Sequence, residues 1–290
     1  MKKNALLRLL AFVLAMMLCV PALGMAEEDD PKLAEGADIR IMSFNLMHPD
    51  WSKVKITGRP QKAADILLYY QPDVVGVQEC SSAWHKGFKP ILVDTGLYAP
   101  ACRQSHAEGF KYNMTSFLYN TQTVKLVDEY ILDLIPRNDI RVFAVAVFEK
   151  LSDGSRFVVT NTHPASSTDV ADYAQHCADI LKLGAEEMQK YADLPVIMTG
   201  DFNTREQSDM YQQFLQGLNV QDAKYAADVL VREHATYAEW QQAPAPGNVD
   251  CIDHIFVNGK TDVKLFNVVI GHDVQTITDH FPIYADIDLQ

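Results

Sequence analysis

The pattern of apolar and polar positions switches repeatedly along the chain between two periods. Short runs that alternate or are continuously apolar predict β-strands, because a strand presents successive side chains to opposite faces. Stretches with apolar residues three and four positions apart predict helices. The predicted strands are residues 38–46, 73–78, 116–119, 141–149, 156–162, 194–199, 252–257 and 281–287.

Two helices have the clearest pattern. Pro60 opens the first, and its apolar residues are Ala63, Ile66, Leu67 and Tyr70, the spacing of one helical face. The second helix spans residues 169–191. Its spacing predicts a buried face made of Val170, Ala174, Cys177, Leu181, Ala185 and Met188.

The order of these elements favours an α+β fold in which packed sheets are flanked by helices. The turn at residues 152–154 joins two neighbouring strands, and regular alternation of strand and helix is rare, which disfavours a dinucleotide-binding fold. No GxGxxG sequence follows a predicted strand, so a dinucleotide site has no support.

Polar side chains gather at the ends of the predicted strands. Those at the ends of the first, second, fifth and sixth strands, and at the starts of the last two, are Asn45, Glu79, His163, Asp201, Asn203, Asp253, Asp279 and His280. If the last two strands run opposite to the other four, all these groups meet at one edge of the sheets. Oxygen ligands at this density suit a hard cation such as Mg²⁺. A metal with carboxylates and histidines is suited to phosphoester hydrolysis.

The N-terminus predicts export. Basic residues, a continuous apolar run and small residues follow one another over residues 1–26, the layout of a signal peptide too short to span a membrane. The alternative is a retained anchor helix. Residues 27–36 are charged and predict a flexible lead-in, which leaves one domain over residues 37–290. We expect a secreted or periplasmic monomer without stable membrane insertion.

Charge and cysteines narrow the function further. The formal net charge of −13 repels polyanions and favours a small phosphorylated substrate over long nucleic acid. Four cysteines follow the leader, Cys80, Cys102, Cys177 and Cys251. Cys177 is expected to be buried in its helix, and a disulfide between two of the others stays open. Their spacing does not favour a zinc site.

Six short motifs together resemble the endonuclease/exonuclease/phosphatase superfamily. In chain order they are SFNL around Asn45, PDVVGVQE ending at Glu79, NTH ending at His163, MTGDFN at 198–203, IDHIFV at 252–257 and TDHFP around His280. Each is weak alone, but all six occur in the family's order and cover nearly the whole predicted domain. The resemblance implies a deoxyribonuclease-I-like fold, a four-layer sandwich of two mixed, largely antiparallel sheets between helices.

The resemblance also implies a role at each matching position. Glu79 corresponds to the principal metal ligand, with Asn45 and Asp279 beside it, and the implied cofactor is Mg²⁺ with Mn²⁺ as a substitute. The implied catalytic residues are Asp201 and Asn203, which place or deprotonate the attacking water, His280 paired with Asp253, and His163, which donates to a phosphate oxygen.

Some positions depart from the family pattern. Pro164-Ala165-Ser166 follows His163 where related members often have Leu-Asp-His, which leaves the substrate class open. Relatives build much of their substrate pocket from the region of residues 103–119. Candidates for substrate binding are Arg103, His106, Glu108, Lys111, Asn113 and Arg141.

These observations predict a secreted, divalent-metal-dependent phosphodiesterase or phosphatase that acts on a small phosphorylated substrate by water attack at phosphorus. An extracellular endonuclease is the alternative. A sphingomyelinase-like lipid phosphodiesterase is a further one, although the sequence has no apolar hairpin for a membrane. A binding module that has lost catalysis is disfavoured because Glu79, Asp201 and His280 are all present.

Overall fold

The computed structural model describes residues 31–104, 112–135 and 141–290, so the expected signal peptide lies outside the described residues. Two β-sheets form the centre. The first has the strand order β10 (Val229–Leu230), β12 (Thr261–Val268), β13 (Ile283–Leu289), β1 (Ile39–Asn45), β2 (Val74–Gln78), β4 (Ser116–Asn120), β3 (Tyr98–Ala101). The second has the order β5 (Val124–Asp133), β6 (Val142–Lys150), β7 (Arg156–Thr162), β8 (Val196–Asp201), β11 (Asp253–Val257), β9 (Gln221–Asp222).

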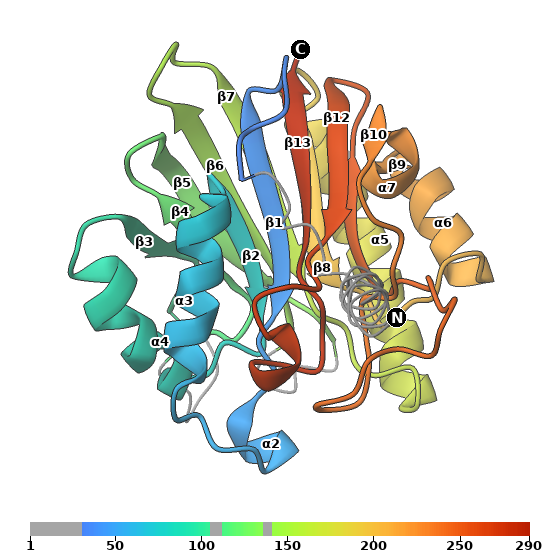
Figure 1. Ribbon diagram of the computed structural model, residues 1–290. Coiled ribbons are helices and arrows are strands. Elements are labelled where there is room, and N and C mark those ends of the chain that lie inside the picture. Colours follow the sequence, from blue (N-terminus) through green and yellow to red (C-terminus); the bar gives the residue numbers. More distant parts are fainter. Residues whose placement is uncertain (1–30, 105–111, 136–140) are drawn as a thin grey trace, which may run out of the picture. The chain divides into compact units, whose positions relative to one another are not determined.

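Helices cover the outer face of each sheet (Figure 1). Helices α3 (Arg59–Tyr70) and α4 (Ser82–Phe88) bury apolar residues against the first sheet. Helices α5 (Val170–Lys190) and α6 (Asp209–Leu218) do so against the second. The short elements are α2 (Pro49–Ser52), α7 (Ala223–Ala226), the π-turn Lys89–Val93 and the 3₁₀ turn Val274–Thr276. This arrangement confirms the predicted α+β fold of two packed mixed sheets flanked by helices.

Strand β6 shows how the layers form. Its side chains alternate between two hydrophobic cores because a strand has period two. Ala144, Ala146 and Phe148 pack into the core that includes the first sheet. Phe143 and Val145 pack into the core formed with α5 and α6. A strand that is buried on both faces reads as a continuous apolar run, which is the pattern of residues 142–148.

The strand directions bring the polar strand ends together. β1 runs parallel to β2 and β7 runs parallel to β8. β13 pairs antiparallel with β1, and β11 pairs antiparallel with β8. The carboxyl ends of β1, β2, β7 and β8 and the amino ends of β11 and β13 therefore lie at the same edge, as the sequence predicts.

The two sheets approach closely at Gly76 in β2. A Cβ atom built at Gly76 would lie 2.1 Å from Thr199 Oγ1 and 3.0 Å from the amide of Asn161. The Asn161 amide nitrogen, on β7, donates to the carbonyls of Val77 (3.0 Å) and Ser116 (2.9 Å) on the first sheet. Gln78 donates to Asn161 Oδ1 at 2.7 Å. The sheet interface beneath the polar edge is therefore a buried amide network.

The predicted buried face of the long helix is partly wrong, although Leu181 and Met188 do pack, half-buried, against the core formed with α6. Val170 is 73% exposed, and Ala174 and Ala185 are also exposed. The buried residues are His176, Cys177, Ile180, Gly184 and Glu187. Gly184 is on this face because its Cα lies against Leu218 and Met198, where a Cβ would come within 2.9 Å of Leu218. The buried position predicted for Cys177 is confirmed.

The chain is tied to the first sheet from Pro31 onward. The Arg40 guanidinium, in β1, donates to the carbonyls of Pro31 and Lys32 at 2.7 Å. It also forms a buried ion pair with Asp286 of β13 at 2.6 Å, and Asp286 accepts from the amide of Ala34 at 2.8 Å. The described part of the expected lead-in is thus hydrogen-bonded to β1 and β13.

The close approach at Gly76 generates a stability prediction. We expect Gly76→Ala to lower the free energy of unfolding by about 1–3 kcal/mol or more, because an added methyl group forces the packed sheets apart. Gly259→Ala is the control, since no atom lies within 4 Å of a Cβ there. Urea unfolding of both variants measures the difference, and equal stabilities would contradict the close packing described here.

Candidate active site

The edge that collects the strand ends contains every residue predicted to bind metal or to act in catalysis. The first sheet contributes the end of β1, the turn after β2 and the segment before β13. The second sheet contributes the segments after β7 and at the end of β8, and the first residue of β11. The residues at these places are Asn45, Glu79, Asp279, His280, His163, Asp201, Asn203 and Asp253.

Asp201 lies at the centre of this group and is buried. Its Oδ2 atom is 2.9 Å from the amide nitrogen of Asn45, 3.3 Å from His163 Nε2 and 3.7 Å from His280 Nε2. The backbone N–H of Asn203 donates to Oδ1 at 2.9 Å. Burial alone would raise the pKa of Asp201, but the charges of His280 and His163 outweigh it and hold the pKa below its ordinary value. Asp201 is therefore a carboxylate at neutral pH.

His280 is held by a second carboxylate. Its Nδ1 atom lies 2.9 Å from Asp253 Oδ2, across the two sheets. Burial would lower the pKa of His280, but Asp253 and Asp201 outweigh burial and hold the pKa well above its ordinary value. The raised pKa favours the imidazolium form, in which Nδ1–H donates to Asp253 while Nε2 faces Asp201.

Glu79 and Asp279 form an acidic pair. Glu79 has φ = 57°, the left-handed region that L-residues rarely occupy and that is often found at functional sites. Its Oε2 atom accepts from the backbone N–H of His48 at 2.5 Å. Burial and then the charge of Glu79 raise the pKa of Asp279, although His280 opposes them. A divalent cation would relieve this repulsion.

Two places at this edge have donors for a cation. Asp201, Asp253 and His280 offer ligand atoms within 4.8 Å of one another, but their oxygen and nitrogen atoms already bond to each other and include an imidazole, a donor set more typical of transition metals. Glu79, Asp279 and the amide oxygen of Asn45 are all oxygen donors, which Mg²⁺ prefers. The second set fits the cation better because its charges are less well compensated.

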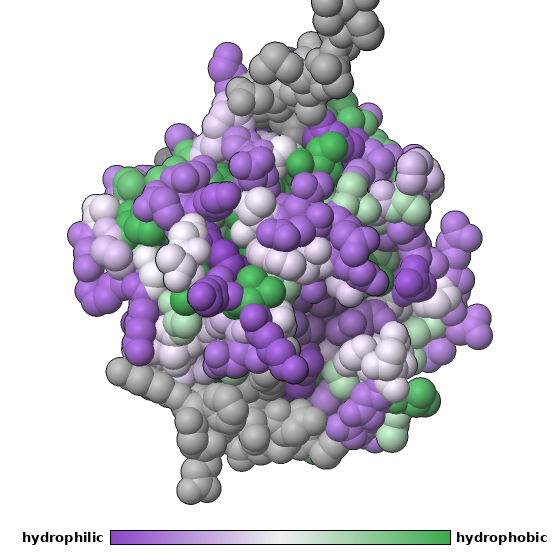
Figure 2. All heavy atoms as spheres, turned by 60° about the horizontal axis from the view of Figure 1, so that its bottom comes forward, coloured by the Kyte–Doolittle hydropathy of each residue, from purple (hydrophilic) through white to green (hydrophobic). Residues whose placement is uncertain are grey.

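A cavity of about 700 Å³ opens above these residues. Arg141 lines it, and its Nη1 donates to the His163 carbonyl at 3.3 Å. Burial lowers the pKa of Arg141, while Glu79 and Asp201 oppose this shift, so the guanidinium lies near both carboxylates. The other lining residues include Ser166, Ser167, Thr168, Tyr173, Arg205, Ser208, Asp209 and Tyr237. Figure 2 brings this end of the sheets forward and shows a mainly hydrophilic surface.

Two predicted substrate-binding residues do not line this cavity. Asn113 is buried, and its amide nitrogen donates to the carbonyls of Cys102 (3.1 Å) and Thr115, so it shapes its own loop. Arg103 lies over the ring of Tyr112, 4.1 Å from its centroid, and borders a separate small cavity. The remaining candidates of this region, His106, Glu108 and Lys111, lie outside the described residues.

Tyr237 is a site residue that sequence reasoning missed. Its ring centroid lies 5.1 Å from that of His280, and its backbone pairs with His280 in an isolated bridge. Its position in a loop between short elements gave no periodic signal. Ser166, the last residue of the departure Pro164-Ala165-Ser166, and Thr168 also line the cavity. That departure was therefore the sequence signal available for this part of the wall.

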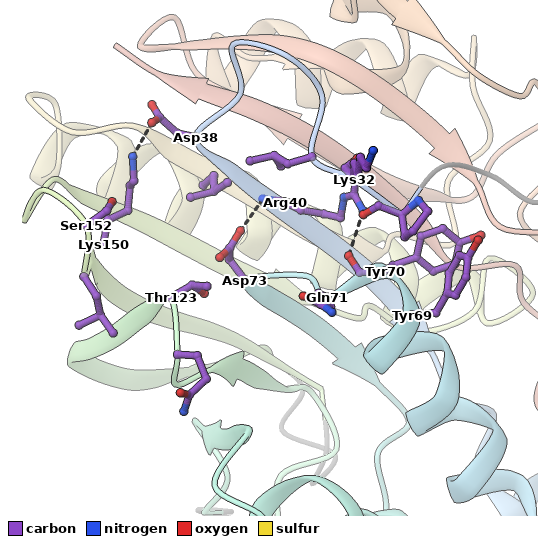
Figure 3. A pocket seen from close by; sticks show the side chains of 15 residues that line it. Lys32, Asp38, Arg40, Tyr69, Tyr70, Gln71, Asp73, Thr123, Lys150 and Ser152 are labelled. Carbon is purple, nitrogen blue, oxygen red and sulfur yellow. Dashed lines mark hydrogen bonds and ion pairs between the residues drawn. The ribbon is translucent and has the colours of Figure 1, made fainter.

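A second cavity, of about 720 Å³, lies at the opposite end of β1 and β2 (Figure 3). Its charged residues are used by the protein itself. Lys150 pairs with Asp38 and Asp153, and the Arg40 backbone donates to Asp73 at 2.7 Å. We therefore assign the chemistry to the cavity of about 700 Å³, where the charges of Glu79 and Asp279 are not balanced by cations in this way.

The comparisons with known proteins agree with this geometry. The sequence profile of the Endonuclease/Exonuclease/phosphatase family matches residues 42–280. The chain belongs to this family. Members of the family hydrolyse phosphoesters and generally depend on a divalent metal.

Similar proteins within the family have different named activities. A mannosyl-6-phosphatase of Bacteroides thetaiotaomicron superimposes with a TM-score of 0.72 at 20% identity, covering 86% of this chain and 99% of that one. The human Nocturnin catalytic domain superimposes with a TM-score of 0.67 at 20% identity, covering 88% and 94%. At this identity the likeness shows the fold. The angel protein of Drosophila melanogaster is 33% identical over 181 residues, which cover 56% of this chain and 47% of that one.

The chain spans about half or less of the length of the curated relatives that it matches. Within the described residues, none of the helices has the length and apolar character required to cross a membrane. The four cysteines in the described part of the chain are buried free thiols.

The His280–Asp253 pair generates a prediction about pH. In the metal-free protein, we expect Asp253→Asn to lower the pKa of His280, because the variant removes the nearest negative charge. The raised pKa belongs to the folded state, so protonation of His280 stabilises the fold below its unfolded pKa, and this contribution is lost as pH rises through the folded pKa. We therefore expect Asp253→Asn to lose less folding stability than the wild type as the pH rises through the folded pKa of His280.

NMR titration of the His280 ring protons measures the shift directly. Asp193→Asn, at an exposed residue, is the control that leaves the titration unchanged. An unaltered midpoint in Asp253→Asn would show that Asp253 does not set the charge of His280.

Proposed function

We propose that this protein is an exported, Mg²⁺-dependent hydrolase that cleaves the phosphoester of a small phosphorylated substrate by attack of water at phosphorus. The observation that carries the proposal is the arrangement around Asp201, a buried carboxylate between His163 and His280, with His280 backed by Asp253. Membership of a family of phosphoester hydrolases supports it. Export rests on the sequence of residues 1–26 alone.

The low pKa of Asp201 favours one of two roles for this residue. A carboxylate whose pKa is depressed is a weak base but a good hydrogen-bond acceptor. Asp201 therefore orients the attacking water, and Asn203, which donates to it through its backbone N–H, keeps the carboxylate in place. Asn45 fixes the second oxygen from the other sheet.

Positive groups and hydrogen-bond donors surround the proposed position of the phosphoryl group. The Nε2–H of His280 and the ring of His163 are directed toward the same space as Asp201, and the Arg141 guanidinium lies nearby. Donors held in a buried site stabilise negative charge that develops on phosphoryl oxygens, with little cost in reorganisation. Glu79, Asp279 and Asn45 would hold the Mg²⁺ ion, which supplies further neutralisation of that charge.

A small substrate is favoured over long nucleic acid. The chain has a net charge of −13. Apart from the histidines, the basic residues among the described lining residues of the cavity are Arg141 and Arg205, and Arg205 is paired to Asp250. Hydroxyl side chains form much of the remaining wall. The name of the Bacteroides relative, a mannosyl-6-phosphatase, supports a phosphorylated sugar as one of the substrates to test.

The first test is hydrolysis of a phosphoester panel with Mg²⁺ or Mn²⁺ and with chelator. The panel contains p-nitrophenyl phosphate, its bis ester, sugar phosphates, plasmid DNA and sphingomyelin. We expect metal-dependent turnover of a small ester, and a decrease of about 10²–10⁴-fold in kcat for His280→Ala and Glu79→Ala. Asp193→Asn is the control. Preferred cleavage of DNA would replace the small-substrate proposal by an endonuclease.

Metal binding tests the choice between the two cation positions. We expect saturating Mg²⁺ to raise the Tm of the wild type, because a ligand that binds only the folded state stabilises it. Asp279→Asn should lose most of this increase, whereas Asp253→Asn should keep it. The reverse result would move the cation to Asp201, Asp253 and His280.

A further inference from the structure

Arg59, at the start of α3, contacts the two loops that carry the proposed metal ligands Asn45 and Asp279. Its side chain is 2% exposed. Nη2 donates to the carbonyls of Leu46 and Met47 at 2.7 Å, and Nε donates to the carbonyl of Ile277 at 2.6 Å. The first two carbonyls follow Asn45 directly, and the third lies two residues before Asp279. One guanidinium therefore cross-links the loops that supply both of these side chains.

Aromatic rings on two other elements restrict the guanidinium further. Its carbon lies 4.9 Å from the ring centroid of Trp84 in α4 and 5.5 Å from that of Trp240. Stacking of this kind holds the plane of an arginine side chain. Trp84 also donates to the Met47 carbonyl at 3.5 Å. The orientation of Arg59 is thus set from several directions.

The charge of Arg59 interacts with the carboxylates of Glu79 and Asp279. Burial lowers its pKa to about 10, while Asp279 and Glu79 act in the opposite direction, so the guanidinium stays charged at neutral pH and lies close to both carboxylates. Its buried Nη1 atom has no hydrogen-bond partner among the described residues. An unpaired buried donor is costly, and the carboxylates that act on the charge of this guanidinium are those of Asp279 and Glu79.

We propose that Arg59 is a positioning residue of the metal centre, which holds Asn45 and Asp279 in the arrangement that binds the cation. This role rests on the metal site of the proposed function. The alternative is that Arg59 only stabilises the fold. The two differ in their consequence for metal affinity: outer groups that orient metal ligands typically change affinity by about 10–100-fold when altered, whereas a distant structural arginine leaves it unchanged.

Arg40 is a matched control within the same chain. It is also 2% exposed, and it also donates to three backbone carbonyls, those of Pro31, Lys32 and Tyr70. It lies at the opposite end of β1 from Asn45. Arg40→Lys should therefore lower stability without changing metal affinity.

The experiment measures Mn²⁺ affinity by EPR of the free ion, together with thermal unfolding in chelator. For the full-length protein, we expect Arg59→Lys and Arg59→Gln to bind Mn²⁺ about 10–100-fold more weakly than wild type, while Arg40→Lys binds it equally well. Lysine keeps the charge, but its single nitrogen cannot reach both the carbonyls of Leu46 and Met47 and the carbonyl of Ile277. Excess Mn²⁺ should restore turnover in Arg59→Lys but not in His280→Ala.

Wild-type affinity in Arg59→Lys would overturn the proposal. So would tighter binding by Arg59→Gln, which would mean that Arg59 acts on the cation by repulsion. If neither variant folds, Trp240→Leu, which removes one stacking partner, should weaken Mn²⁺ binding in the same direction, and unchanged affinity would count against the role. A wild type that binds no metal contradicts the proposed function itself and leaves Arg59 no centre to position.

Discussion

The hydrogen bonds of the Asn161 amide fix how the two sheets meet beneath the polar edge, and the site depends on them. Asn161 bonds to two carbonyls and one amide of the opposite sheet, next to Gly76, where only a residue without a side chain fits. Both polar atoms of the Asn161 amide are hydrogen-bonded, although Gln78 Oε1 beside it has no partner among the described residues. Buried hydrogen bonds of this kind allow few alternative arrangements of the groups that form them. It therefore fixes the relative position of the sheets directly beneath the polar edge.

The polar edge is made from both sheets, so its chemistry requires that relative position. The contacts Asn45–Asp201 and His280–Asp253 each cross from one sheet to the other. The arrangement also separates charge. Asp201 and Asp253 are compensated by imidazoles, whereas Glu79 and Asp279 repel each other and leave a place for a cation. A single edge thus contains one half in which imidazoles pair with carboxylates and another half to which we assign the metal in our proposal.

Sequence reasoning predicted which strand ends meet, because strand direction alone brings Asn45, Glu79, Asp201 and His280 to one edge. It missed β5 and β12. Both strands have a register shift, between Leu126 and Asp128 and between Val263 and Leu265, and a bulge interrupts the period of two on which strand prediction relies.

The face of α5 was misassigned for a related reason. Its buried side includes His176, Gly184 and Glu187, whose burial depends on tertiary partners: His176 accepts from the Ala165 N–H at 3.0 Å, and Glu187 accepts from Tyr130. Apolar periodicity cannot detect such residues. Arg59 and Tyr237 were missed likewise, since their contacts join segments far apart in the chain.

The close fit at Gly76 has a consequence for how the protein would fail on heating. A small slip of one sheet over the other would separate the pairs that cross between them long before either hydrophobic core opened. The proposed activity would then disappear while most of the secondary structure persisted.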